Sequence, residues 1–490
     1  MADTRAFLQA QEIPGMVIGD AYAPGSWASC ERFDVEDPSY GAVVTDLPLG
    51  TIGHIDQAVS AAADAYRSGV WSDMIPRERG RVLAKLAHRL ADAEKERLAL
   101  LESIDIGKPL RVSRVDVEVC AGYFEYYAGL ADKCLGTTQR VQSDGTGLVF
   151  REPVGVSAQI IPFNFPMQQI GRGVAPALAA GCSVVIKPSP EAALTASCIA
   201  RLALESGVPE GVINVVTGGA DIGEALVSHP MIHQVTFTGS VAAGISVTQK
   251  AAENVVPTLL ELGGKSPSVV MNDYGRDAIA GVGRMAFYNT GQNCGAGTRL
   301  LLHRDIADQF LEELVGWAQA LTVGPAQEDP YLGPLISARQ LEKVNAYIAL
   351  AKEEGGSFLL GGESPLRGRA QNGYFVEPTI ITGLPRDSRL FSEEIFGPVL
   401  CVDVFETLDE AIQISNATEY GLSAYIWTQN LSGAMEFAKR VHSGGVSING
   451  GVGTGIELPS GGVKKSGWGR EKGPSALENY TYVKSVTVKH

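Results

Sequence analysis

The chain has 490 residues, of which 45% are hydrophobic and 19% are charged, and its formal net charge at pH 7 is −15. This length exceeds what one hydrophobic core usually organises, so we expect two or three domains. The acidic balance argues against nucleic acid and against an anionic membrane as partners, because neutralising phosphate groups requires a basic surface.

No segment has the pattern of a membrane span or a secretory leader. Every apolar run is shorter than the roughly 18 to 20 residues that a span needs. Met1-Ala2-Asp3-Thr4-Arg5 lacks a basic stretch followed by an apolar one. The cysteines stand at positions 30, 120, 134, 182, 198, 294 and 401, and no two form a Cys-x-x-Cys pair. Neither a disulfide framework nor a metal site is therefore expected, and a cytoplasmic location fits best.

The amino-terminal third divides into two patterns. The first 50 residues alternate short apolar runs with Gly, Pro and Asp, which is typical of strands and turns. Residues 54–68 and 77–106 follow, with apolar residues recurring at spacings of three and four, and this periodicity predicts helices.

From about residue 150, short apolar strands alternate with helices. Strands are predicted over 154–161, 183–186, 212–216 and 233–238, and helices over 174–180, 193–205 and 223–227. Such alternation predicts a parallel sheet that is covered on both faces. Dinucleotide-binding domains have this arrangement, although many other folds share it.

A second α/β series runs from about residue 255 to 450, with strands predicted over 268–271 and 299–302. The carboxyl-terminal segment 480–488 alternates apolar and polar residues as a strand does. No hairpin partner is evident beside it, so it could pair within the chain or with a second subunit.

The strongest chemical signal is the run Gly291-Gln292-Asn293-Cys294-Gly295-Ala296-Gly297. Small residues around one cysteine leave room for a ligand to reach the sulfur and for backbone N–H groups to face it. A lone cysteine is usually a small buried apolar residue, but glycines on both sides fill a core poorly. Cys294 is therefore a candidate nucleophile.

Two further runs carry candidate catalytic groups. In Leu260-Glu261-Leu262-Gly263-Gly264, a carboxylate between apolar residues could have a raised pKa and act as a general base. In Pro162-Phe163-Asn164-Phe165-Pro166, a rigidly held amide could stabilise an oxyanion. Taken singly, an ordinary surface glutamate and a turn-capping asparagine are the simpler interpretations.

Together these segments resemble the aldehyde dehydrogenase superfamily, of the NAD(P)-dependent hydrolytic type. The resemblance covers nearly the whole chain and includes Glu-Leu-Gly-Gly-Lys at 261–265, Gly-Gln-x-Cys at 291–294, Glu-Glu-Ile-Phe-Gly-Pro at 393–398 and Ser-Gly-x-Gly-Arg-Glu at 466–471. It implies an α/β fold with a Rossmann-type parallel-sheet cofactor domain, a second α/β catalytic domain and a small β oligomerisation element.

The resemblance also implies domain boundaries and an assembly. The cofactor domain would comprise residues 1–131 and 150–254, the catalytic domain residues 255–465, and the bridging element residues 132–149 and 476–490. The implied assembly is a homodimer or a homotetramer, and the implied substrate is a small aldehyde.

Catalytic roles follow from the same resemblance. Cys294 would attack the aldehyde, and the Asn164 side chain and the Cys294 backbone N–H would hold the resulting oxyanion. After hydride transfer to the nicotinamide, Glu261 would activate the water that hydrolyses the thioester. Glu471 would occupy the acidic position of a proton relay.

The implied cofactor is NAD. Lys187 would contact the adenosine ribose, Gly239 and Ser240 would open a helix whose amino end faces the pyrophosphate, and Glu394 would bind the nicotinamide ribose. The remaining implied contacts are Ile161, Ser189, Leu262 and Phe396. A plain strand-to-helix turn, a solvated carboxylate and a core aromatic residue are the alternatives for these positions.

Several positions depart from the family pattern. Phe163 replaces the usual Trp before the Asn. Pro190 stands where many NAD-preferring members carry a Glu, with Glu191 one place later, so NADP stays an alternative to NAD. Arg172-Gly173 stand where many members have an aromatic residue and a proton-relaying Lys, and Gly173 leaves that route undefined.

The departures bear on the substrate, for which the expected contacts are Phe165, Arg172, Asn293 and Val452. Arg172 could bind an acid-bearing or strongly polar aldehyde. Alternatively, it pairs with a local carboxylate and the substrate is neutral. Tyr288 occupies a position where semialdehyde enzymes often have a second Arg. Ser460 and the glycine-rich run 450–455 suggest a roomy tunnel wall and a bulky, aromatic substrate.

Three other functions compete with this one. An aldehyde dehydrogenase that passes the acyl group to coenzyme A lacks the carboxylate base, so Glu261 argues against it. A thiol hydrolase needs a His beside the Cys, and no such pairing is evident. A non-enzymatic protein retaining the fold is disfavoured because nucleophile, base and oxyanion donor are all present.

Overall fold

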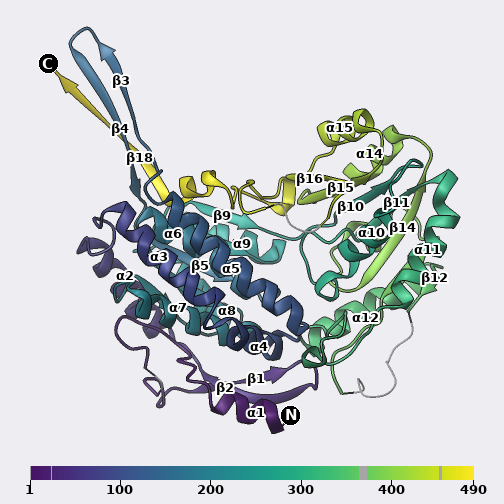
Figure 1. Cartoon of the computed structure of the whole chain (residues 1–490), viewed down its shortest axis with the longest axis horizontal. Helices are drawn as coiled ribbons and strands as arrows, with labels where there is room; N and C mark the ends of the chain where they lie inside the picture. Colours follow the sequence, from purple (N-terminus) through teal and green to yellow (C-terminus); the bar gives the residue numbers. More distant parts are fainter. Residues whose placement is uncertain (1, 24, 363–371, 452–454) are drawn as a thin grey trace.

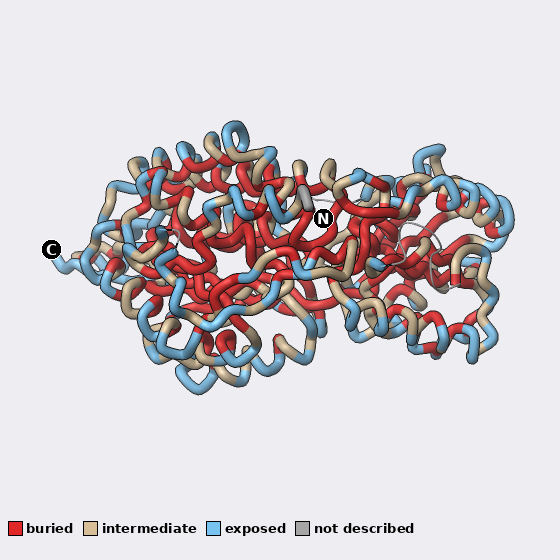
Figure 2. Tube along the Cα trace, turned by 90° about the horizontal axis from the view of Figure 1, so that it is seen from below, coloured by how far each residue is buried: buried red, intermediate tan, exposed pale blue. Residues whose placement is uncertain are grey.

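The computed structural model describes residues 2–23, 25–362, 372–451 and 455–490. Two large sheets occupy separate halves of the molecule, and a narrow β arm projects from one half (Figure 1). Buried residues fill the interior of both halves (Figure 2). Among the described residues, no helix combines the length and the apolar character needed to cross a membrane.

The first sheet has six strands in the order β17-β9-β8-β5-β6-β7. Its strands are β5 (Val156–Ile161), β6 (Ser183–Pro188), β7 (Ile213–Val215), β8 (Gln234–Thr238), β9 (Thr258–Glu261) and β17 (Gly467–Trp468). All neighbours pair in parallel except β17 and β9, which are antiparallel. The predicted Rossmann-type parallel sheet is confirmed, and it includes the strand that ends in Glu261.

Helices cover both faces of this sheet because its buried strands send alternate side chains to opposite sides. Val184 of β6 packs into one hydrophobic core and Val185 into the other. The helices are α2 (Ile52–Arg67), α3 (Pro76–Ala91), α4 (Lys95–Ile106), α5 (Leu110–Leu130), α6 (Pro166–Ala180), α7 (Leu194–Ser206), α8 (Ala220–Val227) and α9 (Val241–Glu253). Residues of α3 to α7 form the first core, and residues of α2, α8 and α9 contribute to the second.

The second sheet has seven strands in the order β12-β13-β14-β11-β10-β15-β16. The strands are β10 (Pro267–Val270), β11 (Arg299–His303), β12 (Ser357–Leu360), β13 (Thr379–Thr382), β14 (Val399–Phe405), β15 (Ser423–Trp427) and β16 (Gly445–Ile448). Only β12 runs antiparallel to its neighbour. The helices of this half are α10 (Ala278–Phe287), α11 (Ala307–Gln319), α12 (Ala338–Glu353), α13 (Arg389–Ser392), α14 (Leu408–Asn416) and α15 (Leu431–Arg440).

The projecting arm is a three-stranded antiparallel sheet of β3 (Thr137–Gln142), β4 (Gly145–Pro153) and β18 (Thr481–Lys489), as Figure 1 shows. The carboxyl-terminal strand β18 pairs with β4 along its whole length, from Thr481 opposite Pro153 to Lys489 opposite Gly145. Pairing within the chain is therefore realised. The outer edge of β18 has no strand partner in the described part of the chain.

Three helix predictions and one strand prediction differ from the structure. Residues 77–106 form two helices, because Asp92 leaves the helical conformation at φ −108° and ψ −80°. The helix predicted over 174–180 already begins at Pro166, a residue well suited to a first helical turn, and the one predicted over 223–227 begins at Ala220. The first 50 residues contain helix α1 (Ala2–Gln9) besides strands β1 (Arg32–Asp37) and β2 (Ala42–Pro48).

Candidate active site

The predicted catalytic segments meet where the two large sheets face each other. The Asn164 segment links β5 to α6, Glu261 ends β9, and the Cys294 loop precedes β11. The Cys294 loop follows a short 3-10 turn whose residues Asn289, Thr290 and Gly291 have φ of 51°, 56° and 71°. A Cβ on Gly291 would lie 2.2 Å from the carbonyl oxygen of Gly397, so only glycine fits at position 291.

Asn164 is hydrogen-bonded to the loop that carries the cysteine. Its side-chain Nδ2 donates to the carbonyl oxygen of Gln292 at 3.0 Å. In return, Asn289 Nδ2 donates to the backbone carbonyl of Asn164 at 3.1 Å. An amide N–H₂ has two donors, so Asn164 retains a second N–H that a substrate oxyanion could accept.

The two glycines after Glu261 allow three segments to approach closely. A Cβ on Gly264 would lie 2.3 Å from the carbonyl oxygen of Cys294, and one on Gly263 would lie 2.5 Å from Glu394 Oε2. The backbone N–H of Gly264 donates to Glu394 Oε1 at 2.9 Å. The segment that follows Glu261 therefore packs directly on the cysteine loop and on the glutamate predicted to bind the nicotinamide ribose.

Glu261 is buried, and its charge is set by two neighbours. Burial raises the pKa of Glu261 to about 7, with Arg172 lowering it and Glu471 raising it. Its Oε2 accepts a hydrogen bond from Arg172 Nη2 at 3.2 Å. Oε1 is buried and has no hydrogen-bond partner among the described residues. A carboxylate that titrates near neutral pH and has one free oxygen suits a general base.

Arg172 lies between the two carboxylates that are candidate catalytic groups, Glu261 and Glu471. Besides its contact with Glu261, its Nε forms an ion pair with Glu471 Oε2. Although burial lowers the pKa of Arg172, the charges of Glu471 and Glu261 raise it above its ordinary value. Of the two interpretations of Arg172, the structure supports pairing with local carboxylates. Gly173 contributes no side chain here, and a Cβ at that position would lie 2.3 Å from Gln159 Oε1.

Cys294 is partly exposed and carries a protonated thiol at neutral pH. Burial raises the pKa of the thiol to about 12, with Arg172 lowering it and the carboxylates of Glu261 and Glu394 raising it. The sulfur lies 4.0 Å from Oδ1 of Asn293, which accepts the backbone N–H of Gly295 at 3.1 Å. Because the thiolate is the nucleophilic form, attack requires a base to take the proton.

The predicted cofactor contacts gather at the carboxyl ends of the first sheet. From β5 the chain proceeds to β6 and β7 on one side, then returns to β8 and β9 on the other. Doubly wound sheets bind ligands at such a reversal. Ile161 ends β5, Lys187 and Ser189 lie at the end of β6, and Gly239 and Ser240 follow β8.

Two local features of this edge suit an anionic ligand. Ser240 caps α9, and its Oγ accepts the N–H of Ala243 at 3.3 Å, leaving a helix amino terminus at the crevice. Lys187 is buried, and burial lowers the pKa of its ammonium to about 8, with Glu191 and Asp221 raising it. Ser189 Oγ donates to Glu191 Oε2 at 2.5 Å, so a carboxylate stands beside the lysine.

Of the other predicted contacts, Leu262 follows β9 of the first sheet, and Glu394 and Phe396 precede β14 of the second. Leu262 is buried directly after Glu261. Burial raises the pKa of Glu394 above its ordinary value, although the hydrogen bond from Gly264 acts to lower it. Phe396 has φ 63°, and its ring meets that of Phe163 edge to face, with centroids 5.7 Å apart. Phe163 therefore supports Phe396 as an aromatic neighbour.

The predicted substrate contacts are only partly described. Phe165 stacks on Tyr288 with ring centroids 6.2 Å apart and planes 13° apart. The Lys108 ammonium lies 4.1 Å from the centroid of Phe165. Asn293 adjoins the cysteine, whereas Val452 lies outside the described residues.

One neighbour of the site was missed by the sequence analysis. Lys472 has φ 62°, and its ammonium is within electrostatic reach of Arg172, Glu471, Glu261 and Cys294. Burial lowers the pKa of Lys472 to about 8. A charged residue after Arg-Glu resembles a surface position in sequence, and the only sequence hint is its place next to Glu471 of the expected proton relay.

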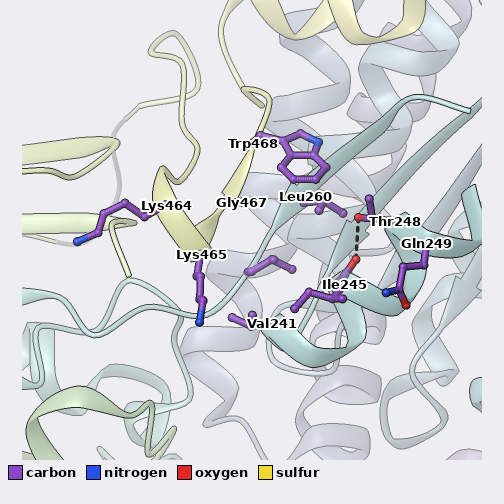
Figure 3. Close-up of a pocket in the computed structure, with 11 residues that line it drawn as sticks. Val241, Ile245, Thr248, Gln249, Leu260, Lys464, Lys465, Gly467 and Trp468 are labelled. Atoms are coloured by element: carbon purple, nitrogen blue, oxygen red, sulfur yellow. Dashed lines mark hydrogen bonds between the residues drawn. The ribbon is translucent and has the colours of Figure 1, made fainter. Parts of the chain in front are cut away.

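An apolar pocket lies beside α9 (Figure 3). The predicted cofactor contact Leu262 is among its lining residues. Its walls include Val241 and Ile245 from α9 and Leu260 and Trp468 from the paired strands β9 and β17, with Lys465 also lining it. The catalytic candidates Cys294, Glu261 and Asn164 do not line it. Across the described residues, no group of three or more His, Cys, Asp or Glu side chains is arranged to hold a metal ion.

The chain is similar to characterised dehydrogenases along nearly its whole length. The model of the aldehyde dehydrogenase family matches residues 27–486. Betaine aldehyde dehydrogenase 1 from Oryza sativa subsp. japonica is 40% identical over 483 residues, covering 96% of this chain and 95% of the relative.

Two solved structures are also similar to this chain along nearly its whole length. Betaine aldehyde dehydrogenase from Staphylococcus aureus in complex with NAD+ is 34% identical, with a TM-score of 0.95 over 100% of this chain and 97% of that chain. Indole-3-acetaldehyde dehydrogenase from P. syringae, in complex with NAD+ and IAA, is 38% identical, with a TM-score of 0.95 over 100% of this chain and 99% of that chain.

Proposed function

The chain belongs to the aldehyde dehydrogenase family, and on that premise we propose that it oxidises an aldehyde to a carboxylic acid with NAD as hydride acceptor. The observation that carries this proposal is the meeting of three segments: Asn164 is bonded to the Cys294 loop, and the glycines after Glu261 pack on that loop. Nucleophile, oxyanion donor and base are thus all available at one place.

The first half of the reaction forms a covalent adduct. Cys294 loses its proton to solvent water, and its sulfur adds to the aldehyde carbon. The carbonyl oxygen becomes an oxyanion that the second N–H of Asn164 and the backbone N–H of Cys294 stabilise. The resulting thiohemiacetal holds a tetrahedral carbon whose hydride can leave, which converts the adduct into a thioester.

The residues present fit a nicotinamide dinucleotide. The amino end of α9 and Ser240 suit its pyrophosphate, and the buried Lys187 suits ribose hydroxyls. Glu394 is held by Gly264 close to the cysteine loop, where a nicotinamide ribose would lie. When bound, the cofactor supplies the hydride acceptor, and the protein orients it and keeps water away from the ring.

The second half of the reaction hydrolyses the thioester. Glu261 takes a proton from water, the water oxygen adds to the acyl carbon, and the carbon–sulfur bond breaks to release the acid and regenerate Cys294. The free Oε1 of Glu261 and a pKa near 7 support this role. Transfer to coenzyme A, the main alternative, needs no such base, and a non-enzymatic role leaves the three groups without a purpose.

NAD rather than NADP is favoured by Glu191. Its carboxylate accepts from Ser189 and raises the pKa of Lys187, so it lies close to the lysine proposed for the ribose. A carboxylate there can accept a ribose hydroxyl and repels a 2′-phosphate. Glu191 thereby substitutes for the glutamate that is missing at Pro190.

For the substrate, we propose an uncharged, bulky aldehyde. Arg172 is engaged by Glu261 and Glu471, so it is poorly placed to bind a substrate carboxylate. Phe165 stacks on Tyr288, which suits an aromatic group. The similar enzyme from P. syringae is named for an aromatic aldehyde.

We further propose a homo-oligomer in a reducing compartment such as the cytoplasm. The outer edge of β18 is free in the described chain, and Val483 and Val488 are exposed on that strand. All seven cysteines are free. In domain terms, residues 1–131 and 150–254 would bind the cofactor, residues 255–465 would carry the cysteine, and the arm would bridge subunits. Light scattering that gives a monomer mass would contradict the assembly.

The test of the function is a panel of aldehydes followed by the absorbance of the reduced cofactor, with NAD and NADP in parallel. We expect turnover with NAD, strongest for phenylacetaldehyde-like substrates, and none with Cys294→Ala, which should still bind NAD. Turnover by that variant, or acyl-coenzyme A formation by the wild type, would refute the proposal.

A further inference from the structure

A single guanidinium connects two buried carboxylates beside the proposed nucleophile. The side chain of Arg172 is 12% exposed, that of Glu261 3% and that of Glu471 2%. Arg172 Nη2 donates to Glu261 Oε2 at 3.2 Å, and Nε pairs with Glu471 Oε2. Two neighbouring buried carboxylates can both stay ionised at neutral pH only with a cation between them.

The side of this cluster away from Glu261 is firmly anchored. The backbone of Glu471 exchanges two hydrogen bonds with that of Ser460, at 2.7 and 2.8 Å. The Ser460 hydroxyl also lies 3.4 Å from Arg172 Nη2. Arg172 itself projects from the buried helix α6. The guanidinium is therefore fixed by elements other than β9, and it can fix Glu261 in turn.

The contact with Glu261 is asymmetric. Arg172 engages Oε2, and the backbone N–H of Gly462 also lies near the carboxylate and lowers its pKa. Oε1 is buried and makes no hydrogen bond of normal geometry among the residues that the structure describes. A carboxylate held by one oxygen presents the other in a defined direction. That geometry suits the removal of a proton from a water molecule at one place.

We propose that Arg172 is a positioning residue for thioester hydrolysis, which holds Glu261 through Oε2 against Glu471 so that Oε1 is aimed at the attacking water. In this role the arginine does not recognise the substrate. The inference rests on the proposed function and deepens it.

The charges around Glu261 support the role. Burial and Glu471 raise the pKa of Glu261, and Arg172 and Arg470 lower it, with the result near 7. Without Arg172, the two carboxylates would share a proton and the base would be lost at neutral pH. The titratable groups that face the pair of Arg172 and Glu261 are Glu471, Arg470, Lys472, Cys294 and Tyr123.

The test compares Arg172→Met, Arg172→Lys and Glu471→Gln with the wild type. Arg201→Met is a matched control, since Arg201 lies on the distant helix α7, is 13% exposed and pairs with two glutamates, Glu12 and Glu205. Rapid mixing with NAD and phenylacetaldehyde measures the first turnover. The pH profile of kcat measures the pKa of the base.

We expect Arg172→Met to retain a first-turnover burst approaching one equivalent per site, with steady-state kcat reduced about 100-fold. The acid limb of its pH profile of kcat should move to higher pH. Arg172→Lys should partly restore both the value of kcat and the position of this limb. Glu471→Gln should move the limb to lower pH, because a like charge is removed. Arg201→Met should behave as wild type.

Other outcomes overturn the inference. A selective rise of KM for 4-oxobutanoate in Arg172→Met, with an unchanged limb for phenylacetaldehyde, would make Arg172 a substrate anchor. If the acid limb of kcat stays at the same pH in all variants, the cluster of Arg172, Glu261 and Glu471 has only a structural role. Either result leaves the proposed function intact, whereas a wild type without NAD-dependent oxidation would refute the function and this inference together.

Discussion

The side-chain amide of Asn164 donates a 3.0 Å hydrogen bond to the carbonyl oxygen of Gln292, two residues before Cys294. Asn289 closes the contact by donating to the carbonyl of Asn164. The two loops are thereby held as a unit, although one follows β5 of the first sheet and the other precedes β11 of the second. The amide that we propose as oxyanion donor is thus held in place without a bound substrate.

The first prediction concerns that donor. Asn164→Ala should lower kcat by about 10²–10³-fold, because one preorganised hydrogen bond to the oxyanion is lost. Asn254→Ala removes an amide that donates to the carbonyl of Ser228 far from the site, and it should leave kcat unchanged. Steady-state kinetics of both variants provide the measurement. Equal rates for Asn164→Ala and wild type would show that the oxyanion is stabilised elsewhere.

The pH dependence of kcat follows from Glu261. Its raised pKa of about 7 means that the carboxyl is protonated below that pH and cannot accept a proton from water. We therefore expect kcat to fall tenfold per pH unit on the acid side, with the limb near pH 7. An acid limb near the ordinary glutamate value of about 4.5 would contradict a buried base.

Cofactor choice should depend on Glu191. Glu191→Gln removes a charge that would oppose a 2′-phosphate, so the ratio of kcat/KM with NADP to that with NAD should rise about tenfold. Glu210→Gln, with a more distant carboxylate after α7, should leave the ratio unchanged. If both variants keep the wild-type ratio, Glu191 has no part in the discrimination.

Close packing at Gly264 gives a prediction about geometry. Gly264→Ala would place a methyl group 2.3 Å from the carbonyl oxygen of Cys294, so the cysteine loop must shift and activity should fall at least 100-fold. Gly316→Ala in α11 meets no atom within 4 Å and should stabilise the protein by about 1 kcal/mol without affecting kcat. Thermal unfolding and kinetics together separate the two effects.

The parts that could be predicted from the sequence are those with local signals. The parallel sheet is visible because buried strands such as Ser183–Pro188 are short apolar runs between helices. Cys294 and Glu261 stand out because glycines accompany them, and the structure explains these glycines by close contacts with neighbouring segments.

The remaining features depend on contacts between distant residues. Arg172 pairs with Glu261 and Glu471, which lie far from it in the chain, so its sequence neighbours could not decide between substrate and local carboxylate. The burial of Lys472 and the pairing of β18 with β4 likewise arise only from tertiary structure. The break at Asp92 was hidden because the apolar periodicity resumes immediately afterwards.

The covalent role of Cys294 with Glu261 as base is tested most directly by trapping the acyl enzyme. Glu261→Gln should be incubated with NAD and phenylacetaldehyde, quenched in acid and digested for mass spectrometry. The account predicts about one acyl group per subunit on the peptide that contains Cys294, together with one equivalent of reduced cofactor and very slow further turnover. Wild-type turnover by this variant, or an acyl group on any other residue, would contradict it.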